Sequence, residues 1–92
     1  MTCKLKCKIK NGLFDNEYAI LAKDLDGRVL ETWADKSQVE PLEEVGSEEW
    51  SEGFVEVLVL KSFGEYLNVL LPNETYVGHR VITVSGKSVK FA

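Results

Sequence analysis

The sequence predicts an all-β fold, a small barrel or two-sheet sandwich of about six to seven short antiparallel strands. Apolar residues alternate with lysine over residues 3–10, which is the period of a strand with one solvent-exposed face. Tight-turn signals recur between short apolar segments, and no segment has convincing helical periodicity. Residues 1–92 are expected to form a single domain, with an SH3-like barrel as first choice and an OB-like barrel as second.

The first strand and its hairpin are predicted from residues 3–12. Along this strand one face carries lysines and the other apolar residues, namely Lys4, Lys6, Lys8 and Lys10 against Cys3, Leu5, Cys7 and Ile9. The pair Asn11-Gly12 favours a two-residue hairpin turn. That turn places Ile9 opposite Phe14 in the returning strand.

A second hairpin is predicted to join residues 17–23 and 28–34. The connecting residues 24–27 read Asp-Leu-Asp-Gly, which fits a type I turn closed by a glycine in the left-handed region. This turn sets the register, in which Ala22 lies opposite Leu30.

The rest of the chain is divided by one long acidic loop. Residues 35–39 leave the second hairpin in a single turn, and residues 40–53 form a loop with room for one short helical turn. Residues 54–61 form the most apolar strand, expected at the centre of the sheet with Leu58 in the core. Three short strands follow, at residues 66–71, 81–84 and 88–91.

A faint internal resemblance links residues 32–39 with residues 83–89. Both segments begin with threonine and end with a Lys-Ser pair close to a valine. We interpret them as two similar strand ends and not as a duplicated domain.

The charge of the chain is concentrated in the long loop. Residues 40–52 hold six glutamates and no basic residue, whereas the rest of the chain has eleven basic and nine acidic residues. The net charge of −4 works against general nucleic-acid affinity. No apolar run is long enough to span a membrane, and the first residues lack the apolar region of a signal peptide, so we expect a cytoplasmic protein.

The composition of the acidic loop, with apolar side chains among glutamates, predicts that this segment docks on another protein. Its apolar side chains would anchor the partner, and its charges would steer a basic surface toward it. The alternative is a solvated loop that only aids solubility. The candidate residues are Leu42, Val45, Glu48, Glu49 and Trp50, with Tyr76, His79 and Arg80 in the following loop. The leading interpretation is a non-catalytic interaction module, an accessory or assembly factor that binds another protein.

Two other classes of function stay open. Single-stranded nucleic acid could bind by stacking and phosphate contacts to Trp33 and to the lysine row of Lys4, Lys6, Lys8 and Lys10. An enzyme could use Cys7 and His79 as a nucleophilic pair, although an inward-facing thiol is usually inert. A zinc site is not expected, because Cys3, Cys7 and His79 supply too few ligands, and no cofactor is expected.

Overall fold

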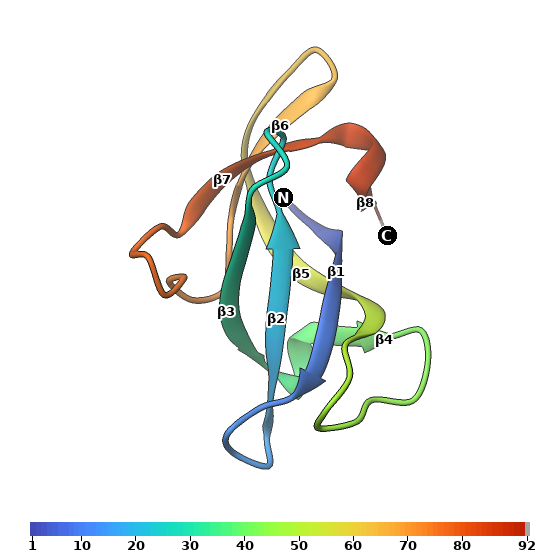
Figure 1. Ribbon diagram of the computed structural model, residues 1–92. Coiled ribbons are helices and arrows are strands. Elements are labelled where there is room, and N and C mark those ends of the chain that lie inside the picture. The colour runs from blue at the N-terminus through green and yellow to red at the C-terminus, as the bar shows by residue number, and fades with distance from the viewer. Residues whose placement is uncertain (92) are drawn as a thin grey trace.

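The computed structural model describes residues 1–91, in which the regular secondary structure consists of strands and two short 3-10 turns (Figure 1). The all-β fold class is therefore confirmed. The elements are β1 (Thr2–Asn11), β2 (Glu17–Lys23), β3 (Val29–Asp35), η1 (Lys36–Gln38), β4 (Val39–Pro41), β5 (Ser51–Phe63), β6 (Tyr66–Leu70), β7 (Val81–Ser85), η2 (Gly86–Ser88) and β8 (Val89–Lys90). No helix within residues 1–91 is long and apolar enough to cross a membrane.

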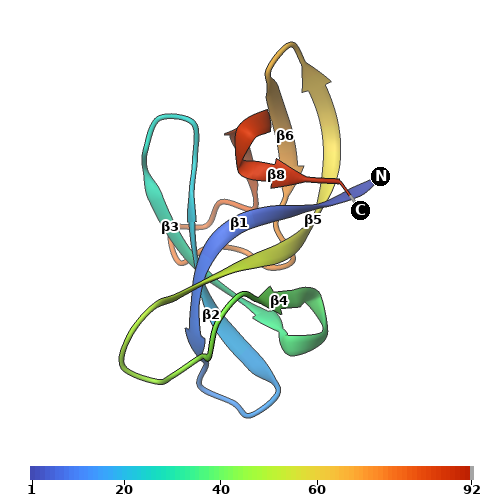
Figure 2. The same ribbon diagram turned by 90° about the vertical axis from the view of Figure 1, so that its right-hand side faces the viewer.

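The strands form one antiparallel sheet in the order β3-β2-β1-β5-β6-β7, to which β4 and β8 add at β5 and β1. The sheet curls strongly into a half-barrel (Figures 1 and 2). At its centre β1 pairs with β5 over most of its length, with Leu5 opposite Val55. The predicted central position of the most apolar strand is confirmed, because β5 pairs with β1, β4 and β6.

The core fills the concave side of this curled sheet. Alternate residues of each strand point inward, as the period of a β-strand requires. The buried apolar residues are Cys3, Leu5, Cys7, Ile9, Ile20, Ala22, Leu30, Ala34, Val55, Val57, Leu67, Val69, Leu71, Ile82 and Val84. Both cysteines are in this set, which confirms that they face inward.

The predicted register of the first hairpin is wrong. Ile9 lies opposite Ile20 and not opposite Phe14. The chain turns over residues 12–16 because β1 continues one residue further, into the Asn-Gly pair that was expected to form the turn. The residue opposite Ile9 lies six positions further along the chain than predicted. Because six is an even number, the residues of β2 that were predicted to face the core still face it.

The second hairpin has the predicted register. Ala22 lies opposite Leu30, and Gly27 has the expected positive φ of 83°. Trp33 points away from the core on the outer face of β3. The single turn expected after this hairpin is also present, as η1.

The acidic loop is shorter than predicted. Both ends of the predicted loop belong to the sheet, in β4 and at the start of β5, so only residues 42–50 form the connection. The expected helical turn is not present in these residues. The prediction that Leu58 belongs to the core is wrong. Leu58 is 38% exposed, because Val55 and Val57 occupy the inner face of β5 and leave Leu58 on the outer face.

The two halves of the chain have the same architecture. The series β1-β2-β3-η1-β4 is repeated as β5-β6-β7-η2-β8, and the sheet order is symmetric about the β1–β5 pair. Leu5 pairs with Val55, while Val89 pairs with Leu5 and Val39 pairs with Val55. A shift of about 50 residues therefore relates the halves about a pseudo-two-fold axis. The faint sequence resemblance marks η1 and η2, which are equivalent elements of these halves.

Two hairpin loops connect the outermost strands of the sheet. In the β2–β3 loop the N–H of Leu25 donates to the carbonyl of Thr83 in β7 (2.8 Å). In the equivalent β6–β7 loop the N–H of Tyr76 donates to the carbonyl of Glu31 in β3 (3.0 Å). A loop of each half thus forms a backbone hydrogen bond with the outer strand of the other half. Both loops contain a glycine with positive φ, Gly27 and Gly78.

Candidate functional site

The acidic loop, residues 42–50, is fastened to the body of the protein. The N–H of Asn11 donates to the carbonyl of Gly46 (2.8 Å), and the Ser51 hydroxyl donates to the carbonyl of Glu44 (2.9 Å). Val45 is partly buried against the core. Val45 therefore holds the loop in place and is not a free anchor for a partner.

Trp50 is also engaged within the protein. Its side chain is half-buried, and the Lys10 ammonium group lies 4.5 Å from the centre of its ring, in cation–π contact. Leu42, Glu48 and Glu49 are exposed. The loop thus presents charge and one leucine to solvent, while its largest apolar side chain already has an internal partner.

Two of the four lysines in the predicted row, Lys4 and Lys8, have acidic partners in the folded chain. Lys4 Nζ lies 2.8 Å from a carboxylate oxygen of Glu40, and Lys90 approaches the other oxygen at 3.4 Å. Hydrogen bonds from these two lysines lower the pKa of the Glu40 carboxyl group. Lys8 lies 3.5 Å from Glu52. Much of the positive charge expected to contact phosphates is therefore balanced inside the protein.

The residues of the enzyme hypothesis lie in different elements. Cys7 is buried in β1, where burial raises the pKa of its thiol to about 12, with a further contribution from the charge of Glu52. His79 is exposed in the β6–β7 loop, where its backbone N–H donates to the hydroxyl of Thr75 (3.1 Å). Within residues 1–91 no group of three or more His, Cys, Asp or Glu side chains could hold a metal ion.

Arg80 fixes the shape of the β6–β7 loop. Its Nε donates to the carbonyl of Leu71 (2.9 Å) and its Nη2 to the carbonyl of Pro72 (3.1 Å). The guanidinium group is thus committed to backbone carbonyls. Of the three residues predicted for partner contact in this loop, Tyr76 is the one whose exposed side chain is large and apolar.

Four large apolar side chains line one groove on the surface, which we call the aromatic groove. They are Leu13 and Phe14 of the β1–β2 loop, Trp33 of β3 and Tyr76 of the β6–β7 loop. Their exposed fractions are 88%, 65%, 37% and 71% in that order. The groove has a volume of about 530 Å³.

Hydrogen bonds to β3 build one wall of this groove. The side-chain amide of Asn73 donates to the carbonyl of Trp33 (3.0 Å), and the N–H of Tyr76 donates to the carbonyl of Glu31. These bonds lay the β6–β7 loop against β3, as the ribbon shows (Figure 1). The aromatic groove therefore depends on segments that are far apart in the sequence.

Sequence reasoning found half of this groove. The sequence analysis places Tyr76 and Trp33 in two different hypotheses. It does not include Leu13 and Phe14, because the wrong register places Phe14 inside a strand. The signal that could have found them is the Asp-Asn pair that follows Phe14, a second turn-forming pair in the same hairpin.

No family model, curated protein or solved structure matches the chain. Its function is therefore inferred from its own residues and geometry.

Proposed function

We propose that the protein is a non-catalytic interaction module that binds a segment of another protein in the aromatic groove. The observation that carries the proposal is the gathering of four exposed apolar side chains in one concave site. Single exposed apolar residues are ordinary, but a contiguous group of them usually marks an interaction surface. Tryptophan and tyrosine are also among the residues that most often dominate binding energy at interfaces.

The charges around the groove favour a partner with basic residues. Glu17 and Asp35 line the groove, and among residues 1–91 no lysine or arginine belongs to its lining. The whole chain has a net charge of −4. We expect the bound segment to place apolar side chains in the groove and a lysine or arginine at its acidic rim, because such complementarity steers encounter and selects partners.

This proposal moves the principal contact away from the acidic loop. Tyr76 remains a binding residue, while Leu42, Glu48 and Glu49 contribute at most to the attraction of a basic partner. That the barrel is SH3-like and that the protein is cytoplasmic stay predictions made from the sequence.

Selection of peptides displayed on phage tests the proposal. A random library is selected against the purified protein, and the enriched peptides are synthesised and their dissociation constants measured at two salt concentrations. The expected peptides carry an aromatic or branched apolar residue within a few positions of lysine or arginine. Their affinity should fall as salt rises, because exposed charges are screened.

Variants in the groove provide the decisive comparison. Phe14→Ser and Tyr76→Ser remove exposed side chains and should each weaken peptide binding about fivefold or more. Phe63→Ser is the matched control, because Phe63 is also exposed but lies outside the groove, at the end of β5. Failure to enrich any peptide, or equal binding to all three variants, would refute the proposed function.

A further inference from the structure

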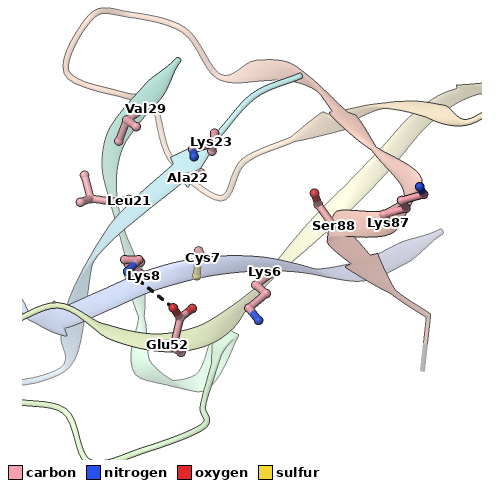
Figure 3. Close-up of a pocket in the computed structure, with 10 residues that line it drawn as sticks. All are labelled: Lys6, Cys7, Lys8, Leu21, Ala22, Lys23, Val29, Glu52, Lys87 and Ser88. Carbon is pink, nitrogen blue, oxygen red and sulfur yellow. Dashed lines mark ion pairs between the residues drawn. The ribbon is translucent and has the colours of Figure 1, made fainter. Parts of the chain in front are cut away.

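A cleft opens between β2 and β8, which both pair with β1 but along different parts of it. On β1, β8 pairs with Lys4 and Leu5, while β2 pairs only from Lys8 onward. Lys6 and Cys7 therefore pair with neither of these strands, and the two diverge on either side of them. The resulting cleft has a volume of about 460 Å³ and is lined by β1, β2, β3, β5 and η2 (Figure 3).

The charged groups around this cleft are mostly basic. The lysines that line it are Lys6, Lys8, Lys23 and Lys87, and they come from three different elements. The one acidic residue is Glu52, which lies 3.5 Å from Lys8 (Figure 3). Four positive charges against one negative charge give the cleft an excess that suits an anion.

The rest of the lining is mostly apolar. It consists of Cys7 from β1, Leu21, Ala22 and Val29 from β2 and β3, and one hydroxyl residue, Ser88 of η2. A volume of this size falls in the range of sites for small organic molecules. An inorganic anion would satisfy the lysines but would leave this apolar surface uncovered. A molecule that joins an acidic group to an apolar body would cover both.

The pseudo-two-fold axis offers a comparison inside the same chain. A shift of 50 residues relates Lys6 to Glu56, Lys8 to Leu58 and Lys23 to Asn73. The equivalent positions of the other half are thus acidic, apolar and neutral. The fold itself does not require lysine at these three places.

We propose that this lysine cleft binds a small organic anion, one that carries a carboxylate, sulfonate or phosphate group on an apolar ring or chain. The lysines bind the acidic group, and the side chains of Leu21 and Val29 contact the apolar part. The lysine cleft shares no lining residue with the aromatic groove, so this site is independent of the protein-binding function.

Two matched dyes test the proposal on the full chain. 8-Anilinonaphthalene-1-sulfonate carries one negative charge, and N-phenyl-1-naphthylamine has the same ring system without the sulfonate. Titration of ¹⁵N-labelled protein should give saturable amide shifts at Leu21, Val29 and Ser88 with the sulfonate. The neutral dye should bind there at least about fivefold more weakly, the factor expected from one charge contact near the protein surface.

Charge variants separate the lysine cleft from general dye binding. Lys23→Glu and Lys87→Glu should each weaken binding of the sulfonate dye about fivefold, and Glu52→Gln should strengthen it. Lys61→Glu is the control, because Lys61 lies outside the cleft on β5. Lys87→Gln is included in case charge reversal perturbs folding, and unchanged amide shifts of the core report an intact fold.

Three results in these titrations would overturn the proposal, and so would a fourth that concerns where the dye binds. They are the absence of saturable shifts at millimolar sulfonate dye, equal affinity for the two dyes, and equal affinity of the wild type and the cleft variants. Shifts confined to residues of the aromatic groove would likewise place the dye elsewhere and exclude the lysine cleft as its site.

Discussion

Leu5 and Val55 lie opposite each other at the centre of the sheet, and both side chains are fully buried. Their neighbours along the strands alternate between the core and solvent, so a residue one position away makes a very different contribution to stability. Two leucines on the paired central strands illustrate this difference, since Leu5 faces the core whereas Leu58 faces outward.

Truncation of these two leucines should therefore have unequal effects. Leu5→Ala is expected to lower the free energy of unfolding by about 2–5 kcal/mol, because it leaves a cavity in the core. Leu58→Ala should cost less than about 1 kcal/mol, because Leu58 remains partly solvated in the native state. Urea unfolding monitored by tryptophan fluorescence measures both values. Equal costs would mean that the inner and outer faces of the sheet are assigned wrongly.

Asp24 is a buried carboxylate with a structural task in the β2–β3 loop. One of its oxygens accepts hydrogen bonds from the N–H groups of Asp26 (3.0 Å) and Arg28 (2.9 Å), and the other accepts from the Arg28 guanidinium (3.0 Å). Burial by itself would raise the pKa of this carboxyl group. The hydrogen bonds and the charge of Arg28 outweigh it, so that the pKa lies below its ordinary value of 3.8.

The direction of this shift predicts a dependence on pH. A carboxyl group with a lower pKa in the folded state stabilises that state above the unfolded pKa, and the contribution is lost as pH falls through the folded pKa. Asp24→Asn should therefore reduce the free energy of unfolding by about 1–3 kcal/mol at neutral pH. The difference from wild type should shrink below the unfolded value of 3.8. Denaturant titrations at neutral and strongly acidic pH decide this, and a constant difference would exclude a role for the charge.

The hairpin loops show which elements the sequence could predict. The β2–β3 turn was predicted correctly because residues 24–27 carry all of its signals locally. The β1–β2 turn was misplaced because two turn-forming pairs compete there, and only the pairing of β1 with β2 decides between them. This error did not change which residues of β1 and β2 face the core, so most of the core was predictable from the alternation of apolar and polar residues alone.

The candidate sites were much less predictable than the core. The aromatic groove needs the β6–β7 loop to reach β3, and the lysine cleft needs β2 and β8 to pair with different parts of β1. Both depend on contacts between segments far apart in the chain. Tyr76 and Lys8 could be named as candidates, but no local pattern indicated which residues would lie beside them.

The two loop glycines should be sensitive to substitution. Gly27 and Gly78 have φ of 83° and 89°, where an alanine is strained although no atom obstructs its Cβ. Gly27→Ala and Gly78→Ala should each destabilise the protein by about 1 kcal/mol. Gly46→Ala is the control, because Gly46 has open space and no positive φ. Thermal unfolding of the three variants tests this, and three equal midpoints would contradict it.

At the scale of the whole molecule, the pseudo-two-fold arrangement exchanges strands between the halves. The first half supplies β4 to β5 of the second half, and the second half supplies β8 to β1 of the first. Neither half therefore completes its own sheet. The sequence offers only the faint resemblance between the segments around η1 and η2 as a sign of this arrangement, because few of the remaining equivalent positions carry the same side chain.

Fragment complementation should reveal this mutual dependence. We expect fragments cut between Gly46 and Ser47, in an exposed part of the acidic loop, to be unstructured alone and to recover the native fold when mixed in equal amounts. Near-ultraviolet circular dichroism provides the measurement, since Trp33 lies in one fragment and Trp50 in the other. A native signal from either fragment alone would contradict the expectation.

The pairing of β8 with β1 also constrains how the chain acquires its structure during synthesis. β1 leaves the ribosome before its long partner β5, and well before its last partner, β8, near residue 90. Contacts between such distant segments carry a large loop-closure cost and slow folding. A nascent chain would hold the alternating lysines of β1 in solvent with its backbone edges unpaired, and those charges discourage wrong pairing with other chains until translation supplies the missing strands.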